Sequence, residues 1–288
     1  MRRPNKEILS ITLGVLLSAQ VWAFDIPNLD FNKIMSASKN LVEATKDVSE
    51  PQEIAIGEGM AAVVLGAAPL AKNEVLQRYV NRVGRYLTLQ TERPDLPWYF
   101  GVLDSESVNA FATPGGHILV TYGLLKKMNN EAELAGVLSH EIAHVLKKHH
   151  LAAMKKAGGM TFLTDVASMA VDQTGGGGSY GRALSQNMIS GMKEVLVRGL
   201  DKNDEYEADR MGVVIATRAG YDPYGLPAVL QTLEGLSGRS EATLLFSTHP
   251  APESRLSAMD GQMGKFEHYQ GQSVSERFRK LVPNGGKN

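Results

Sequence analysis

The motif H-E-I-A-H at residues 140–144 constrains the fold of this chain more than any other feature. Two histidines four positions apart lie on one face of an α-helix, with Cβ atoms about 5–6 Å apart, so both imidazoles can reach one metal ion. Apolar residues recur around the motif at helical spacing, which predicts a helix that is buried in the core. These flanking positions are Leu134, Val137, Leu138, Val145 and Leu146.

The composition limits the ligands that a metal site can use. The chain contains no cysteine, which excludes disulfides, cysteine-ligated zinc, iron–sulfur clusters and thiol catalysis. A metal must therefore be held by His, Asp and Glu, and the motif indicates one Zn²⁺ per chain. Glu141 lies on a neighbouring edge of the helix, where it can take a proton from water that the zinc activates instead of binding the metal.

A catalytic zinc needs a third protein ligand and an open position. His150 has the spacing of the third metzincin ligand, but that pattern requires glycine where this chain has Lys147. We therefore expect the helix to continue past Lys147 and to direct His150 away from the metal. The other candidates lie on the acidic segment 204–210, where spacing alone does not distinguish Glu205 from Glu207.

Hydrophobic spacing predicts an α+β fold, mostly helical with one small β-sheet. A single catalytic domain fits the chain, although its length would also allow two. The predicted strands cover residues 98–103, 108–112 and 117–122, and a turn at 113–116 joins the last two as a hairpin. The predicted helices cover residues 52–65, 73–89, 129–150, 188–200, 204–218 and 226–236.

Residues 1–23 have the pattern of a secretory signal peptide: a basic start, an apolar run, and small residues before a cleavage site after Ala23. Cleavage would deliver the chain to the periplasm. The alternative is an uncleaved membrane anchor, but the apolar run is shorter than the roughly 20 residues that a span needs. We expect no transmembrane span in the mature chain. The formal net charge of -1 also argues against a nucleic-acid partner.

Several stretches together resemble the gluzincin zinc metallopeptidases of the HtpX and CAAX prenyl protease family, peptidase family M48, and most of all its exported BepA-like branch. The resemblance implies a zincin-type domain over residues 51–262, with the H-E-x-x-H helix in its core. It leaves 24–50 as a lead-in and 263–288 as a polar C-terminal tail. The matching stretches are residues 53–57, 79–84, 109–116, 140–150, 205–212 and 248–250, with Arg255.

The same resemblance implies roles for individual residues. Glu205, the first residue of the E-x-x-x-D pattern, becomes the third zinc ligand beside His140 and His144. Asp209 gains an active-site role, either orienting a zinc-binding histidine or donating a proton, and its spacing from a ligand favours the first. His249 is implied as a reversible fourth ligand or as a group that stabilises the oxyanion.

Substrate contacts are also implied. Asn109 and Ala110 resemble the edge strand that binds substrate in gluzincins, where main-chain groups pair with an extended peptide. Arg255 either anchors the loop of His249 or contacts a substrate carbonyl. The glycines at 175–178 and the helix after them could form a mobile lid, or they could be a tolerated insertion.

These features predict a zinc-dependent metalloendopeptidase of the bacterial periplasm. By resemblance, its substrates would be misfolded or stalled envelope proteins, including outer-membrane proteins, and the outer-membrane assembly machinery would be a partner in protein quality control. The alternative is a chaperone-like assembly factor with rare or gated proteolysis. The intact Glu141 favours an enzyme, because a protein that only binds its clients has no use for a general base.

Overall fold

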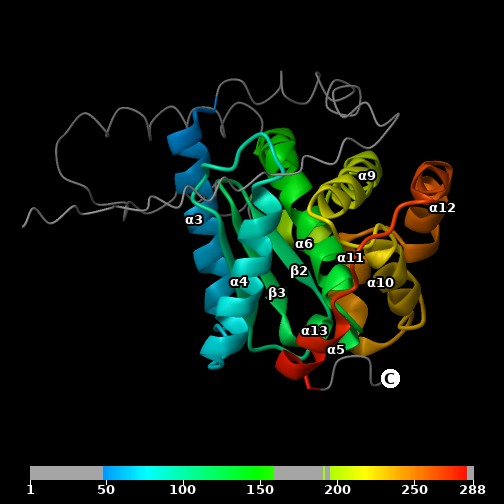
Figure 1. Ribbon diagram of the computed structural model, residues 1–288. Helices are drawn as coiled ribbons and strands as arrows, with labels where there is room; N and C mark the ends of the chain where they lie inside the picture. Colours follow the sequence, from blue (N-terminus) through cyan, green and yellow to red (C-terminus); the bar gives the residue numbers. More distant parts are fainter. Residues whose placement is uncertain (1–47, 159–190, 192–194, 284–288) are drawn as a thin grey trace, which may run out of the picture.

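The computed structural model describes residues 48–158, 191 and 195–283, which form an α+β fold around one small sheet (Figure 1). The predicted fold class is confirmed. The strands are β1 (Tyr99–Leu103), β2 (Ala110–Thr113) and β3 (His117–Thr121). The helices are α3 (Glu50–Ala67), α4 (Glu74–Thr88), α5 (Tyr122–Lys127), α6 (Glu131–Leu146), α9 (Lys202–Arg218), α10 (Gly225–Glu234), α11 (Thr243–Thr248), α12 (Pro252–Met263) and α13 (Ser275–Leu281).

The sheet has the strand order β1-β3-β2, with β1 parallel and β2 antiparallel to β3. The predicted hairpin is confirmed: Ala110 pairs with Val120 and Thr113 with His117. Its turn uses Gly115 at φ 76° and Gly116 at φ 106°, in the left-handed region that glycine adopts without strain. Among the described residues, β2 is an edge strand of the sheet, and it is the strand nearest the motif helix.

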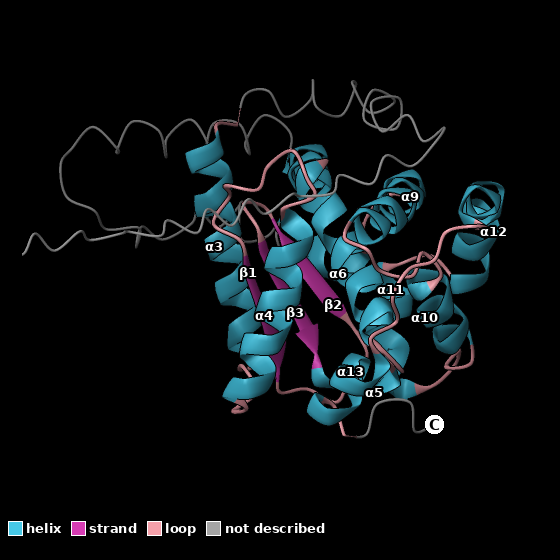
Figure 2. Ribbon diagram, in the orientation of Figure 1, coloured by secondary structure: helices cyan, strands magenta, loops and turns pink. Residues whose placement is uncertain are grey.

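Alternation along the strands gives the sheet two apolar faces, and helices pack against the sheet (Figure 2). One face packs against α4 and α6, and Gly84 of α4 lies so close that a Cβ there would be 2.3 Å from the ring of Phe100. The other face packs against α3, through Val64, Leu103 and Leu119. The first face carries Phe100, Val102, Ala110, Ala112, Ile118 and Val120.

Helix α6 is the buried centre of the fold, as the motif predicts, and every one of its residues is buried. Asn130 caps its start by accepting a hydrogen bond from the N–H of Glu133 at 3.0 Å. Helix α9 packs directly on α6, because a Cβ on Gly212 would lie 2.9 Å from the backbone nitrogen of His140. This close approach sets the acidic face of α9 over the motif histidines.

Helix α6 ends at Leu146, so the expectation that it continues past Lys147 is wrong. Lys148 takes a left-handed φ of 57°, and a new helical stretch covers residues 149–158. A non-glycine residue pays roughly 1–2 kcal/mol for this conformation. Two ion pairs with distant parts of the chain stabilise the turn. Lys148 Nζ lies 3.1 Å from Glu53, and Lys147 Nζ lies 2.8 Å from Glu207.

The C-terminal part is more ordered than its polar composition suggests. Phe266, Phe278 and Val282 are fully buried against the main core. The signal-peptide segment, nearly all of the lead-in, the glycines at 175–178, and residues 188–190 and 192–194 of the predicted helix 188–200 lie outside the described residues. Within the described part, no helix is both long enough and apolar enough to cross a membrane.

Candidate metal centre

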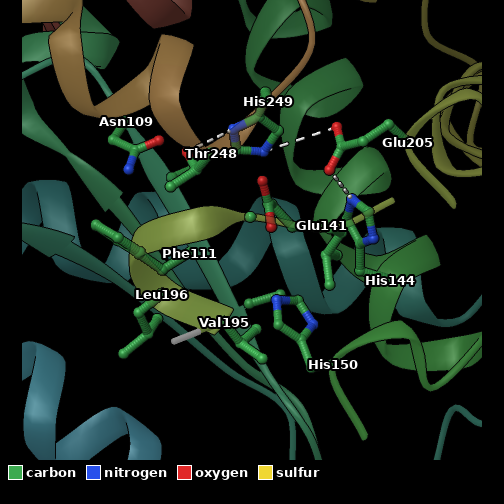
Figure 3. Close-up of a pocket in the computed structure, with 14 residues that line it drawn as sticks. Asn109, Phe111, Glu141, His144, His150, Val195, Leu196, Glu205, Thr248 and His249 are labelled. Atoms are coloured by element: carbon green, nitrogen blue, oxygen red, sulfur yellow. Dashed lines mark hydrogen bonds and ion pairs between the residues drawn. The ribbon is translucent and has the colours of Figure 1, made fainter. Parts of the chain in front are cut away.

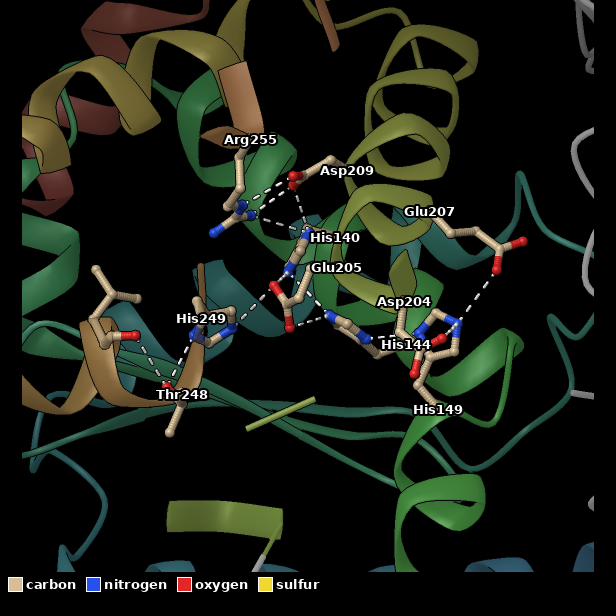
Figure 4. Close-up of polar contacts among 11 residues, drawn as sticks. His140, His144, His149, Asp204, Glu205, Glu207, Asp209, Thr248, His249 and Arg255 are labelled. Atoms are coloured by element: carbon tan, nitrogen blue, oxygen red, sulfur yellow. Dashed lines mark hydrogen bonds and ion pairs between the residues drawn. The ribbon is translucent and has the colours of Figure 1, made fainter. Parts of the chain in front are cut away.

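The three predicted ligands converge at the packing of α6 on α9 (Figure 4). The Nε2 atoms of His140 and His144 lie 3.0 Å apart. Glu205 reaches across from α9, with Oε2 3.7 Å from His140 Nε2 and Oε1 3.6 Å from His144 Nε2. All three side chains are at most 3% exposed, so their polar atoms are directed at one another and not at bulk water.

The carboxylate of Glu205 fits a metal ligand. Both of its oxygens are buried, and neither has a hydrogen-bond partner among the described residues. Burial raises the pKa of Glu205 well above its usual value, which means that a buried charge at this carboxyl needs a cation beside it. Two imidazole nitrogens and one carboxylate oxygen within 4.8 Å of one another are a donor set typical of a catalytic zinc.

Asp209 and Arg255 hold His140 from behind. Asp209 Oδ1 lies 2.9 Å from His140 Nδ1, and Arg255 binds Asp209 through NH2 at 2.6 Å and Nε at 2.9 Å. Burial alone would raise the pKa of Asp209, but the guanidinium holds it well below its usual range. An ionised carboxylate only accepts, so His140 donates from Nδ1 and keeps the Nε2 lone pair toward Glu205. This geometry favours orientation by Asp209 over proton donation.

His249 follows α11 and faces the same centre. Its Nε2 lies 3.9 Å from Glu205 Oε2, and its ring centroid lies 5.9 Å from that of His140. Thr248 donates its hydroxyl hydrogen to the carbonyl of Leu244 at 2.9 Å, so its oxygen accepts from His249 Nδ1, also at 2.9 Å. The lone pair of His249 Nε2 is thereby left to face the centre, a role for Thr248 that the sequence did not reveal.

A pocket opens beside Glu141, which Figure 3 shows between Asn109 on one side and His144 on the other. Burial raises the pKa of Glu141 to about 8. Ala110 on the edge strand also lines the pocket. The side-chain amide of Asn109 is buried, and within the described part of the chain neither of its polar atoms has a partner.

His150 also lines this pocket, so the expectation that it points away is wrong. The helix break at Lys148 turns it back, and its ring lies 5.6 Å from that of His144. Among the described residues, however, His150 belongs to neither group of potential ligands that the structure brings together. The spacing argument against His150 thus loses its reason, the continuing helix, and its exclusion as a third ligand stays a prediction.

From the sequence, His149 is expected to be a structural residue at the end of the motif helix, but the structure places it against a predicted ligand. His149 Nδ1 lies 2.8 Å from His144 Nδ1. On its other side, His149 Nε2 lies 3.5 Å from Glu207 Oε2. Glu207 thus occupies a different edge of α9 from Glu205. The contact depends on the turn at Lys148, and a helix that continued would have carried His149 elsewhere.

Comparison with known proteins gives consistent matches. The sequence pattern of Peptidase family M48 matches residues 72–263. The beta-barrel assembly-enhancing protease of Yersinia pestis is 33% identical over 73% of this chain and 43% of its own length, and that of Escherichia coli K12 is 31% identical over 88% and 52%. The mitochondrial metalloendopeptidase OMA1 of Schizosaccharomyces pombe is 27% identical over 62% and 50%. The chain spans about half the length of the curated relatives it matches.

Proposed function

This chain belongs to peptidase family M48, a family with metalloendopeptidase members, and on that premise we propose that it is a zinc-dependent endopeptidase. The predicted family, and with it the prediction of a metallopeptidase, is confirmed. The observation that carries the proposal is the convergence of His140, His144 and Glu205, with a buried Glu205 carboxylate that has no hydrogen-bond partner among the described residues.

We assign the zinc ligands as His140, His144 and Glu205, and Glu141 as the general base. Zinc, when bound, would supply a Lewis acid for the scissile carbonyl and the attacking water, and a positive charge that lowers the pKa of Glu141. The Glu141 carboxylate takes a proton from the attacking water and delivers it to the nitrogen of the leaving amine. Asp209 accepts the Nδ1–H of His140, so that the Nε2 of His140 faces the centre, and Arg255 keeps Asp209 ionised.

We also propose how the substrate lies. The edge strand β2 can pair with an extended peptide through its main chain, which gives affinity with little demand on sequence. Ala110 and Asn109 line the pocket beside Glu141, and the amide of Asn109 is available to a substrate main-chain group. Arg255 binds Asp209, which supports a positioning role for it and not a contact with the substrate carbonyl.

His249 is proposed as a reversible fourth ligand. Its Nδ1–H is committed to Thr248, so Nε2 presents a lone pair. A group that stabilises an oxyanion must instead donate a hydrogen bond. The lone pair therefore favours metal binding over the oxyanion role.

For the substrates we propose envelope proteins that are misfolded or stalled, with outer-membrane proteins among them. The name of the bacterial relatives, beta-barrel assembly-enhancing protease, supports this choice. Export through cleavage after Ala23 would place the enzyme in the periplasm, near the assembly machinery. The alternative remains a chaperone-like factor with gated proteolysis, which a resting contact of His249 with the centre would suit.

The test measures zinc content and cleavage of casein for the wild type and for Glu141→Gln. We expect one zinc per chain in both, with cleavage reduced about 10²- to 10⁴-fold in the variant. Zinc in both with cleavage in neither would contradict an active protease and favour the chaperone alternative. Rescue of a deletion strain by Glu141→Gln would do the same. Absence of zinc from metal-replete protein would overturn the whole proposal.

A further inference from the structure

The two motif histidines are held in different ways on the side away from the centre (Figure 4). His140 Nδ1 faces a carboxylate, that of Asp209. His144 Nδ1 instead faces a second imidazole, with 2.8 Å between it and His149 Nδ1. Two neutral imidazole nitrogens at that distance share a single hydrogen, so one ring donates and the other accepts. The choice between them decides which nitrogen of His144 keeps its lone pair.

Where a metal takes up the lone pair of His144 Nε2, the ring hydrogen of His144 is on Nδ1, and the surroundings of His149 favour the matching arrangement. Its Nε2 lies 3.5 Å from Glu207 Oε2 and 3.9 Å from Asp204 Oδ1, so two acidic groups favour a hydrogen on this nitrogen. These separations exceed an ordinary hydrogen bond, and the preference is electrostatic. Lys147 Nζ lies 2.8 Å from Glu207 Oε1 and fixes that carboxylate in place. With its hydrogen on Nε2, His149 accepts at Nδ1.

The consequence reaches the metal side of His144. Because His149 accepts, His144 donates from Nδ1 and its Nε2 carries a lone pair. That Nε2 lies 3.6 Å from Glu205 Oε1 and 3.0 Å from His140 Nε2, at the point where the donor set converges. In the opposite arrangement, a hydrogen on His144 Nε2 would occupy the same point and exclude a cation.

We propose that His149 is a positioning residue: by accepting the Nδ1–H of His144, it reserves the Nε2 lone pair of His144 for the metal. Glu207 acts one step further out, by orienting His149. The inference rests on the proposed function, because it takes His144 as a zinc ligand. Outer partners of this kind typically change metal affinity 10- to 100-fold.

The experiment reads the tautomer of His149 in zinc-loaded protein, by long-range ¹H–¹⁵N correlations of ¹⁵N-histidine, and zinc affinity by competition with a chelator. In the wild type we expect hydrogen on Nε2 of His149 and none on its Nδ1. His149→Leu keeps an apolar group in the buried site but removes the acceptor. We expect it to weaken zinc binding by about 10- to 100-fold.

Two further variants separate this role from simple packing. His149→Gln offers an oxygen to His144 and an amide hydrogen to Glu207, so we expect it to restore most of the zinc affinity. His150→Leu removes the neighbouring buried imidazole, which belongs to neither ligand group among the described residues. It should leave the tautomer of His149 and the zinc affinity near those of the wild type.

Several outcomes would overturn the inference. One is a zinc-loaded wild type in which His149 carries its hydrogen on Nδ1, and another is a His149→Leu variant that binds zinc as tightly as the wild type. Where His149→Leu does not fold, Glu207→Gln replaces it, and unchanged affinity there would contradict the role of Glu207. Tight zinc binding with the expected tautomer but no cleavage would contradict the proposed function alone.

Discussion

Two buried carboxylates, one at each end of helix α6, are treated in opposite ways. Glu131 begins the helix, is fully buried, and accepts hydrogen bonds from Tyr79 at 2.8 Å and Tyr221 at 2.7 Å. It also accepts from Arg277 Nε at 2.6 Å. Glu205 lies over the far end of α6, equally buried, and neither of its oxygens has such a partner among the described residues. The hydrogen bonds of Glu131 form a closed cluster, in which protein groups satisfy the carboxylate and stabilise the fold. The Glu205 carboxylate is open, because only a ligand from outside the chain could satisfy it.

The Glu131 cluster joins four parts of the fold. Tyr79 comes from α4, Glu131 from α6, Tyr221 from the turn after α9 and Arg277 from α13. Burial, and next to it the hydrogen bond to Glu131, raises the pKa of both tyrosines, so each remains a donor at neutral pH. The start of a helix also favours a negative charge. Every feature of this cluster serves stability.

Glu131→Gln should produce the largest change in stability. A neutral amide loses the charge that Arg277 and both tyrosines bind, and breaking a buried pair of this kind typically costs 3–5 kcal/mol. Chemical denaturation of the metal-free protein measures it. The matched control is Glu276→Gln on α13, whose side chain is 85% exposed and pairs only with Lys280 among the described residues; there we expect less than about 0.5 kcal/mol. Similar losses of stability in both variants would mean that the buried Glu131 stabilises the fold no more than an exposed glutamate does.

Glu205→Gln should act in the opposite direction on the metal-free protein. The variant removes a buried charge that has no partner, so we expect a gain of about 1–3 kcal/mol in the free energy of unfolding near pH 8. The pKa of Glu205 is raised by burial, so the folded wild type loses stability as the pH rises above the ordinary value of 4.5. The gain should therefore shrink as the pH falls toward 4.5.

Urea unfolding in the presence of a chelator, at about pH 5 and about pH 8, measures this effect. Comparing the variant with the wild type at each pH cancels the groups that titrate in both. Added zinc should stabilise the wild type and leave Glu205→Gln nearly unchanged. A variant less stable than the wild type near pH 8 would show that Glu205 is held by the protein itself, as Glu131 is.

The sequence predicts the side-chain contacts at the histidine end of α6 better than those at its Glu131 end. The H-E-x-x-H spacing predicts the convergence of His140 and His144, because a helix puts them on one face whatever surrounds it. The hairpin is equally local, since Gly115 and Gly116 specify its turn. The Glu131 cluster depends on tertiary packing between residues as far apart as Tyr79 and Arg277, and no spacing rule reaches that far.

The same reasoning explains what was missed at the site. Spacing did not distinguish Glu205 from Glu207, and the family resemblance chose Glu205. Two positions apart on a helix, their side chains point to different sides: Glu205 faces the motif histidines and Glu207 faces His149. The contact of His149 with His144 was not foreseen, because it depends on the left-handed turn at Lys148, which long-range ion pairs favour over helical propensity.

The smallest expected effect comes from a substitution that removes one hydrogen-bond partner of Glu131 and leaves the others. Tyr221→Phe should lower the free energy of unfolding by about 1 kcal/mol, because Tyr79 and Arg277 still satisfy the carboxylate. The control is Tyr269→Phe, which removes a phenol that donates to the carbonyl of Thr217 at 2.7 Å. We expect that loss to be nearer 0.5 kcal/mol, because hydrogen bonds to charged acceptors are the stronger.

Chemical denaturation of both phenylalanine variants decides how the closed cluster works, and zinc affinity should stay unchanged in each. A loss in Tyr221→Phe that matches the loss in Glu131→Gln would mean that the cluster fails as a unit when any partner leaves. In that case Glu131 would need every one of its hydrogen-bond donors, just as Glu205 would need its cation. A small, graded loss would instead show that redundancy among partners separates a carboxylate that stabilises the fold from one that is kept open for a metal.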